Sequence, residues 1–263
     1  LFGSQNEIFA KLWETYKLDS ITGQWDYVEP ALFGYGAGKL IESFTLFYRE
    51  HNNIIAQFHE WMTGAGILYL KKHAPWVSTS FTTHATVLGR CIAGNNRPLY
   101  GKMKEYIPAQ ISREFNIVAK QSLERISALE TDVFTTVSEI TSRECSHFLG
   151  KDVDIVTPNG FEDNFVPDKG SFDYKREAAR DKLLSVAEAV LGYKLPKDSL
   201  LIANSGRYEF RNKGLDVFVD SLGELSREEE VKKVCVAFLL IPAYHKGPRQ
   251  DLDNNLNRNG EAP

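Results

Sequence analysis

Short segments rich in β-branched and aromatic residues alternate with helix-like segments along this chain, and this alternation restricts the fold more than any other feature. Strand-like segments occupy residues 52–61, 76–85, 132–138 and 154–160. Residues 62–73 and a segment with apolar side chains at helical spacing (Val118, Leu123, Ile126 and Leu129) predict helices between them. Strands that are separated by helices pair in parallel. The pattern therefore predicts an α/β fold with a doubly wound, mostly parallel sheet.

The composition of the sequence becomes more polar after Gly160, and this change predicts a domain boundary. Residues 161–198 are polar and contain one amphipathic helix, so we expect a connection there. A strand from Leu200, a turn and a helix over residues 215–222 then open a second α/β unit. The predicted organisation is a first lobe at 1–160, the connection at 161–198, and the start of a second lobe at 199–263.

Five finer expectations accompany this organisation. The helix in the connection should bury Leu183, Val186, Ala187 and Val190 on one face. Residues 233–243 should form a fully buried strand, and the polar end of the chain should be a mobile loop or tail. Ser138 is expected to cap the helix after the third strand. Residues 32–50 predict a helix with a glycine-rich start.

Charge and cysteine usage restrict the partners. The 263 residues carry a net charge of −4 without a block of Lys and Arg, which predicts no nucleic-acid or membrane partner. The three cysteines are far apart, and this favours a reducing compartment such as the cytoplasm. Neither a membrane span nor a signal peptide is predicted. Because the chain begins at Leu1 without a methionine, we expect it to be a piece of a longer protein.

Polar residues gather at the carboxyl ends of four predicted strands, where open α/β sheets bind ligands. They are His59 with Glu60, residues 84–90, residues 157–160 and residues 206–213. In the last group, Gly206, Arg207 and Lys213 precede a helix, and cations at a helix N-terminus suit a diphosphate.

Each of these groups also has a purely structural interpretation, and both stay open. Arg207 can form a solvated pair with nearby Glu209, which contributes only about 0–1 kcal/mol. His59 and His84 can be satisfied core histidines, and the Asn159–Gly160 turn needs no ligand. Neither zinc-type spacing nor a Ser-His-Asp order occurs, and "GYGAGK" lacks the glycine and hydroxyl residue of a phosphate-binding loop. No metal site is predicted.

Five collinear segments carry a family resemblance: "FHEWMTGAG", "FTTHATVLGR", "VFTTVSEIT", "DIVTPNGF" and "GRYEFRNKGLDVF". Together they resemble the eukaryotic-type glycogen synthases, from about residue 54 to residue 218. The resemblance implies a GT-B architecture, in which two Rossmann-like lobes face one cleft. It also implies a retaining glucosyl transfer from a sugar nucleotide to the non-reducing end of an α-1,4-glucan. UDP-glucose is favoured over ADP-glucose as donor, and neither a cofactor nor a metal is expected.

The resemblance also assigns roles to residues. Glu60, His84 and Arg90 match catalytic positions in the cleft, beside the sugar and the leaving group. Arg207 and Lys213, with Gly206, match the donor-phosphate site. His59 and Asn159 match weaker positions, for which acceptor contact and a structural role stay open.

Two departures from the family pattern limit this interpretation. The glycine-rich loop expected in the first lobe is absent, and so is a pair of glutamates eight residues apart in the second lobe; residues 226–233 indicate only a solvated face. We therefore expect an incomplete second lobe, whose exposed apolar strand would favour a homo-oligomer. The alternatives are a non-catalytic glucan-binding or assembly portion of this fold, and a retaining glycosyltransferase with another acceptor.

Overall fold

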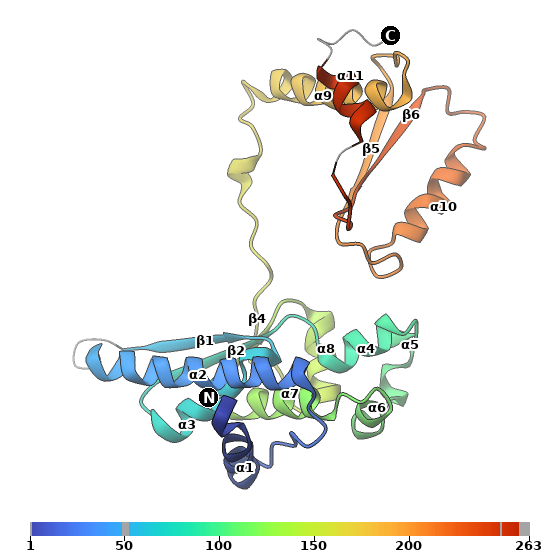
Figure 1. The fold of residues 1–263 in the computed structure, drawn as a ribbon. Coiled ribbons are helices and arrows are strands. Elements are labelled where there is room, and N and C mark those ends of the chain that lie inside the picture. Colours follow the sequence, from blue (N-terminus) through green and yellow to red (C-terminus); the bar gives the residue numbers. More distant parts are fainter. Residues whose placement is uncertain (1, 49–52, 248, 258–263) are drawn as a thin grey trace. The chain divides into compact units, whose positions relative to one another are not determined.

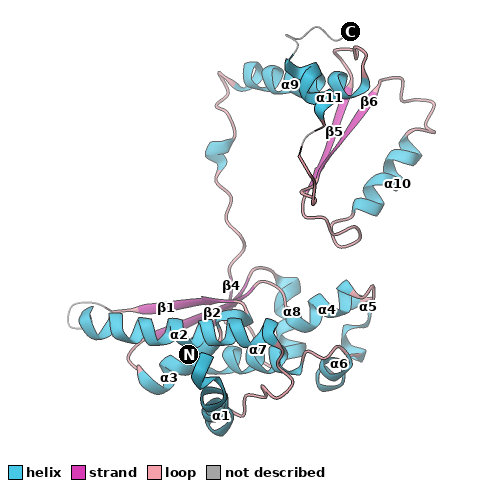
Figure 2. Ribbon diagram, in the orientation of Figure 1, coloured by secondary structure: helices cyan, strands magenta, loops and turns pink. Residues whose placement is uncertain are grey.

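The computed structural model describes residues 2–48, 53–247 and 249–257, and the chain divides into two compact units, Leu1–Gly160 and Phe161–Pro263 (Figure 1). Both units combine helices with parallel strands, which Figure 2 shows in separate colours. The predicted α/β fold class with parallel sheets is confirmed. Each unit is described by itself below.

The first unit is built on a four-stranded parallel sheet in the order β1-β2-β3-β4. The strands are β1 (Ile55–His59), β2 (Ser78–Thr83), β3 (Val133–Thr136) and β4 (Ile155–Val156). All four lie inside the segments that the sequence predicts. The register pairs His59 with Thr82 and Thr83 with Thr136, so the strands end together at one edge of the sheet.

Helices of the first unit pack mainly on one face of this sheet. The largest core cluster joins Phe58, Phe81 and Phe134 of the sheet to side chains of α3, α7 and α8. On the opposite face, the side chains of Ile55, Val133 and Ile155 are exposed among the described residues. A doubly wound sheet has helices on both faces, whereas here they cover mainly one. The helical elements of the unit are η1 (Phe2–Ser4), α1 (Gln5–Tyr16), α2 (Trp25–Tyr48), η2 (Trp61–Thr63), α3 (Ala65–His73), α4 (Val87–Gly94), α5 (Leu99–Lys102), η3 (Met103–Glu105), α6 (Pro108–Glu114), α7 (Val118–Glu130) and α8 (Glu139–Leu149).

The glycine-rich segment lies inside α2, and the prediction that it starts a helix is wrong. A Cβ atom on Gly34 would lie 2.8 Å from the carbonyl oxygen of Thr63, and one on Gly38 would lie 2.9 Å from Cβ of Tyr69. A Cβ atom on Gly66 of α3 would lie 2.7 Å from the carbonyl oxygen of Gly34. The glycines therefore allow α2 and α3 to cross in close contact.

The second unit contains a parallel pair of strands, β5 (Leu200–Ser205) and β6 (Cys235–Leu240). Its small core consists of Leu184, Ala187 and Leu195 packed on side chains of both strands. Thus α9, which lies in the segment expected as a connection, packs on this sheet. The helical elements are η4 (Asp163–Phe165), α9 (Phe172–Leu191), α10 (Leu215–Leu225) and α11 (Gln250–Asn257).

Three predictions for the second unit are corrected by the structure. The buried face of α9 contains Leu184 and Ala187, whereas Val190 is exposed, because the helix is turned relative to the predicted face. β6 is not fully buried, since Leu239 and Leu240 are each 52% exposed in a described sheet of two strands. The polar end contains α11, which is tied to α9 by a 3.0 Å hydrogen bond from Asn255 Nδ2 to the carbonyl oxygen of Ala189. Residue 248 and residues 258–263 lie outside the described residues.

Candidate active site

The carboxyl ends of β1 and β2 bring three predicted site residues together, and Arg90 of α4 joins them through Glu60. His59 ends β1, Glu60 follows it, and His84 follows β2. Because the two strands are parallel neighbours, these ends meet, and His59 Nδ1 lies 3.0 Å from His84 Nε2. The two imidazole rings stack with centroids 5.3 Å apart. The pairing is a direct consequence of the parallel register.

Glu60 is the centre of this group, which we call the β1–β2 cluster (His59, Glu60, His84 and Arg90). Its Oε1 atom accepts a hydrogen bond from the backbone N–H of His84 at 3.2 Å and forms an ion pair with Arg90 Nη2 at 3.3 Å. The side chain of Glu60 is 14% exposed and that of Arg90 is 50% exposed. A partly buried carboxylate is thus held beside a cation that solvent and ligands can reach.

The backbone of Glu60 has φ 62° and ψ 160°, a region in which glycine is almost the only residue without strain. Surrounding hydrogen bonds hold it there. The Glu60 N–H donates to the carbonyl oxygen of Thr82 at 2.9 Å. Thr63 Oγ1 donates to the carbonyl oxygens of His59 at 2.8 Å and Glu60 at 3.2 Å. Strain of this kind concentrates at functional sites, which supports a role for Glu60 beyond packing.

The helix that carries Arg90 begins on a buried polar network. Thr86 caps α4 by accepting a hydrogen bond from the N–H of Gly89 at 3.0 Å, and it donates to Glu144 Oε2 at 2.8 Å. Tyr100 donates to Glu144 Oε1 at 2.9 Å, and burial together with this bond raises the pKa of Tyr100 to about 12. A threonine before a helix is a typical N-cap and could have been predicted. Glu144 sits inside α8, and nothing in its local sequence marks it.

Asn159 follows β4, the strand at the opposite end of the sheet order from β1. It occupies an exposed segment after β4, and the contacts that hold the β1–β2 cluster together do not include it. Its predicted acceptor or structural role stays a prediction.

The predicted phosphate-binding residues lie in the second unit, between β5 and α10. Gly206 follows β5, and a Cβ atom there would lie 3.9 Å from Lys213 Cγ. Gly214 adopts φ 64° and ψ 27° immediately before α10, a left-handed conformation that suits glycine. Arg207 Nε pairs with Glu209 Oε1 at 3.0 Å, and both Arg207 and Lys213 are exposed. The solvated pair and the phosphate site both fit this geometry. Whether these cations face the same cleft as the β1–β2 cluster stays a prediction.

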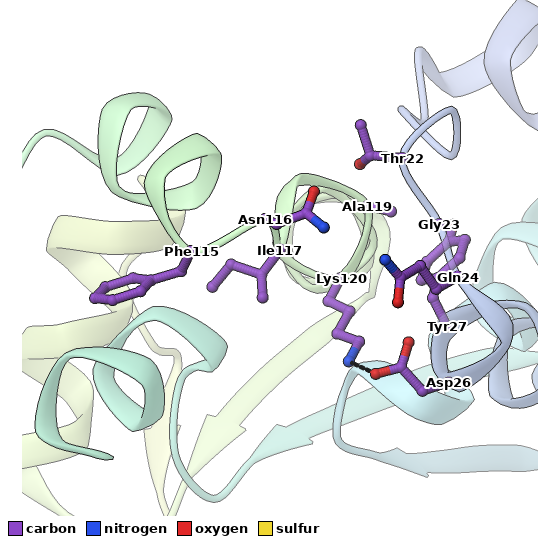
Figure 3. A pocket seen from close by; sticks show the side chains of 10 residues that line it. All are labelled: Thr22, Gly23, Gln24, Asp26, Tyr27, Phe115, Asn116, Ile117, Ala119 and Lys120. Carbon is purple, nitrogen blue, oxygen red and sulfur yellow. Dashed lines mark hydrogen bonds and ion pairs between the residues drawn. The ribbon is translucent and has the colours of Figure 1, made fainter. Parts of the chain in front are cut away.

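A pocket that the sequence does not reveal lies in the first unit (Figure 3). It has a volume of about 230 Å³ and lies between the start of α2 and the start of α7. Lys120 and Asp26 form an ion pair there, and Lys120 Nζ lies 5.6 Å from the ring centroid of Trp61. None of the predicted site residues lines it. The lining residues are Thr22, Gly23, Gln24, Asp26, Tyr27, Phe115, Asn116, Ile117, Ala119 and Lys120.

The described ranges contain neither a metal-binding group nor a membrane-spanning helix. Within residues 2–48, 53–247 and 249–257, no group of three or more His, Cys, Asp or Glu side chains is arranged to hold a metal ion. In the same ranges no helix has the length and apolar character needed to cross a bilayer.

Parallel α/β units with polar side chains at the strand ends define the class of Rossmann-like proteins, which bind ligands at that edge. Comparison with known proteins narrows the class. The family model described as "Glycogen synthase" matches residues 3–250. The chain belongs to the glycogen synthase family, and the resemblance found in the sequence is confirmed.

Individual relatives agree with the family match. The chain is 32% identical over 251 residues to a "Glycogen [starch] synthase" of Neurospora crassa, covering 92% of this chain and 35% of the relative. It is 32% identical to one of Dictyostelium discoideum, covering 92% of this chain and 28% of the relative. It is 33% identical to the "Glycogen [starch] synthase, liver" of Rattus norvegicus, covering 74% of this chain and 29% of the relative. The chain thus spans about a third of the length of these curated relatives.

Proposed function

We propose that this chain is part of a glycosyltransferase that moves glucose from a sugar nucleotide to the non-reducing end of an α-1,4-glucan, with retention of configuration. UDP-glucose is the favoured donor, and the two units correspond to lobes of a GT-B enzyme. We propose that the protein works in the cytoplasm and needs neither a cofactor nor a metal.

The observation that carries the proposal is the β1–β2 cluster in a member of the glycogen synthase family. Glu60, His84 and Arg90 come from separate segments and meet through a hydrogen bond and an ion pair at the carboxyl ends of the strands. Glu60 keeps a strained backbone there. A surface ion pair formed without functional need would not require that strain.

The chemistry explains why these residue types are useful. Breaking a glucosyl–phosphate bond creates a cation-like sugar and a negatively charged diphosphate, and fixed cations lower the barrier where that charge develops. In the proposal, Arg207, Lys213 and the backbone at Gly206 bind the donor diphosphate, and Arg90 stabilises the leaving group. Glu60 orients Arg90, and His84 lies beside the sugar. Asn159 and His59 contribute to acceptor binding or to local structure.

The test is glucosyl transfer by the full-length protein from labelled UDP-glucose or ADP-glucose to a glycogen primer. We expect faster incorporation from UDP-glucose, and product that an α-1,4-specific glucosidase releases. Arg90→Ala should reduce turnover by roughly 100-fold or more. The matched control is Arg113→Ala, which removes an exposed arginine from α6 of the same unit. Equal loss in both variants, or none in Arg90→Ala, would contradict the assigned role.

A further inference from the structure

A second buried carboxyl group supports the start of α4. Glu124 of α7 is fully buried, and its Oε2 atom accepts a hydrogen bond from the N–H of Val87 at 2.9 Å. Val87 is the first residue of α4, whose N–H has no partner within the helix. The other oxygen of Glu124, Oε1, is buried and has no hydrogen-bond partner among the described residues. The carboxyl group therefore binds the helix through one oxygen only.

The groups around Glu124 disfavour a negative charge. Glu60 after β1 and Glu144 of α8 both act on it as negative neighbours, and Arg90 of α4 is the opposing cation. Burial raises the pKa of the Cys91 and Cys145 thiols, and they are also close enough to interact with the charge of Glu124, which raises the pKa of each thiol further. An ionised carboxylate without solvent needs several hydrogen bonds or a close cation, and among the described residues the Val87 amide is the one hydrogen-bond donor to Glu124. A carboxylic acid with its proton on Oε1 avoids most of that cost.

The link from Glu124 to Arg90 is short. Arg90 lies one helical turn after Val87, and its N–H donates to the carbonyl oxygen of Thr86 at 2.9 Å. Thr86 is in turn held by Glu144. A shift of the first turn of α4 would therefore move Arg90 relative to Glu60, with which it pairs.

We propose that Glu124 is a positioning residue that holds Arg90 against Glu60 through the first turn of α4, and that it does so as a neutral carboxylic acid. This inference depends on the proposed function only in the experiments that measure glucosyl transfer. Its structural part, the protonated anchor of α4, can be measured without any substrate.

The proposal predicts a pH dependence with a definite sign. Burial, reinforced by the neighbouring glutamates, raises the pKa of Glu124 from 4.5 to about 8 in the folded protein. The folded state thus keeps a proton that the unfolded state releases between these two values. Stability should fall as pH rises through that window and level off above about pH 8. Ionisation should also place a negative charge under α4 and lower transfer activity on the alkaline side.

The experiment compares three variants of the full-length protein. Glu124→Gln keeps an acceptor for the Val87 N–H and cannot ionise. Glu124→Leu keeps the volume and loses the acceptor, and Glu130→Gln is the control on the same helix. The readouts are hydrogen exchange at the Val87 amide, unfolding midpoints from pH 5 to pH 9, and the pH profile of glucosyl transfer.

We expect Glu124→Gln to show turnover close to wild type at pH 7. It should lack both the loss of stability between about pH 5 and pH 8 and the decline in activity on the alkaline side. Glu124→Leu should exchange the Val87 amide faster and lose roughly 100-fold in turnover, as expected for a displaced catalytic group. Glu130→Gln should match wild type.

The outcomes separate this proposal from the proposed function. A loss of stability between about pH 5 and pH 8 that is as large in Glu124→Gln as in the wild type would overturn the neutral-acid anchor, even if Glu124→Leu fails to fold. Normal Val87 protection in Glu124→Leu would overturn it as well. If the wild-type protein transfers no glucose, the proposed function fails, and the exchange and stability measurements still decide on Glu124.

Discussion

The backbone of Glu60 occupies a conformation in which glycine would be more stable, yet its side chain receives two hydrogen bonds that glycine could not accept. The two requirements conflict, and the chain keeps the carboxylate. This suggests that the side chain is retained for chemistry and that the backbone strain is the cost of placing it.

Substitution can separate these two contributions. Glu60→Gly should relieve backbone strain of about 1–3 kcal/mol, whereas Glu60→Ala should retain it, and both should abolish the pairing with Arg90. We therefore expect the glycine variant to unfold at a higher denaturant concentration than the alanine variant, with turnover strongly reduced in both. Equal unfolding midpoints would show that the φ of 62° carries no strain.

The cations of the second unit make a second prediction at this scale. Arg207 and Lys213 are exposed, so Arg207→Ala and Lys213→Ala should leave the unfolding midpoint of the full-length protein unchanged. Each should lower turnover by on the order of 100-fold to 1000-fold and weaken donor binding. Lys213→Arg should restore activity only in part, because a planar guanidinium does not replace a compact ammonium in a tight turn.

The control for the Arg207 and Lys213 variants is Arg227→Ala. Arg227 is an exposed arginine that follows α10 and forms an ion pair with Glu224. Kinetics like those of the wild type in both alanine variants would support the solvated Arg207–Glu209 pair instead of a phosphate site.

Among the elements, strands were predictable and helix faces were less so. β1, β2 and β3 are short runs of β-branched and aromatic residues between helices, and the sequence locates them well. The buried face of α9 depends on β5 and β6, which follow it later in the sequence. Periodicity alone therefore placed Val190 on the buried face, and the structure shows that it is exposed. The terminal helix α11 is polar, and the sequence pattern gives no sign of the hydrogen bond by which its Asn255 side chain contacts α9.

The candidate site shows the same limit. Parallel strands bring His59 and Glu60 beside His84, so their meeting could be predicted from topology. The role of Thr86 as the N-cap of α4 could be predicted from its place before a helix. The predicted N-cap Ser138 is confirmed, because its side chain accepts a hydrogen bond from the N–H of Thr141 at 3.2 Å. Glu124 and Glu144 lie inside helices, and only the packing of α7 and α8 against α4 reveals their partners.

The crossing of α2 and α3 gives a prediction at the scale of elements. Gly34→Ala would place Cβ 2.8 Å from the carbonyl oxygen of Thr63, so the backbones must separate. We expect a loss of about 1–3 kcal/mol, although alanine is the better helix former. Gly223→Ala inside α10 is the matched control, because no atom lies within 4 Å of its added Cβ. That variant should be stabilised by about 0.5–1 kcal/mol in chemical denaturation.

If Gly34→Ala were as stable as the parent chain, the close approach of α2 to the Thr63 backbone in η2, just before α3, would not depend on glycine. A destabilised Gly223→Ala would show that helix propensity does not govern these positions.

For the molecule as a whole, we expect the 263-residue chain by itself not to synthesise glucan. The proposed donor site needs side chains around the base and the ribose, and the second unit has a sheet of two described strands with Leu239 and Leu240 each 52% exposed. Two exposed cations hold a diphosphate weakly against water and salt. The exposed apolar strand should also promote self-association, which light scattering would detect.

Incubation of the purified chain with labelled UDP-glucose and a glucan primer is the measurement. Sustained incorporation that disappears in Arg207→Ala would contradict the expectation and show that the site is complete within this chain.

The two units have separate cores of very different size. Within the part of the chain that the structure describes, three clusters of buried apolar side chains stabilise the first unit, and one cluster, formed by Leu184, Ala187 and Leu195, stabilises the second. We therefore expect that the chain does not unfold on heating as one two-state system. Calorimetry should resolve two heat-capacity peaks, with the second unit melting first. A bound ligand raises the melting temperature only of the part that holds it. The peak that moves when a sugar nucleotide is added would therefore identify the unit that binds it, without any assay of catalysis.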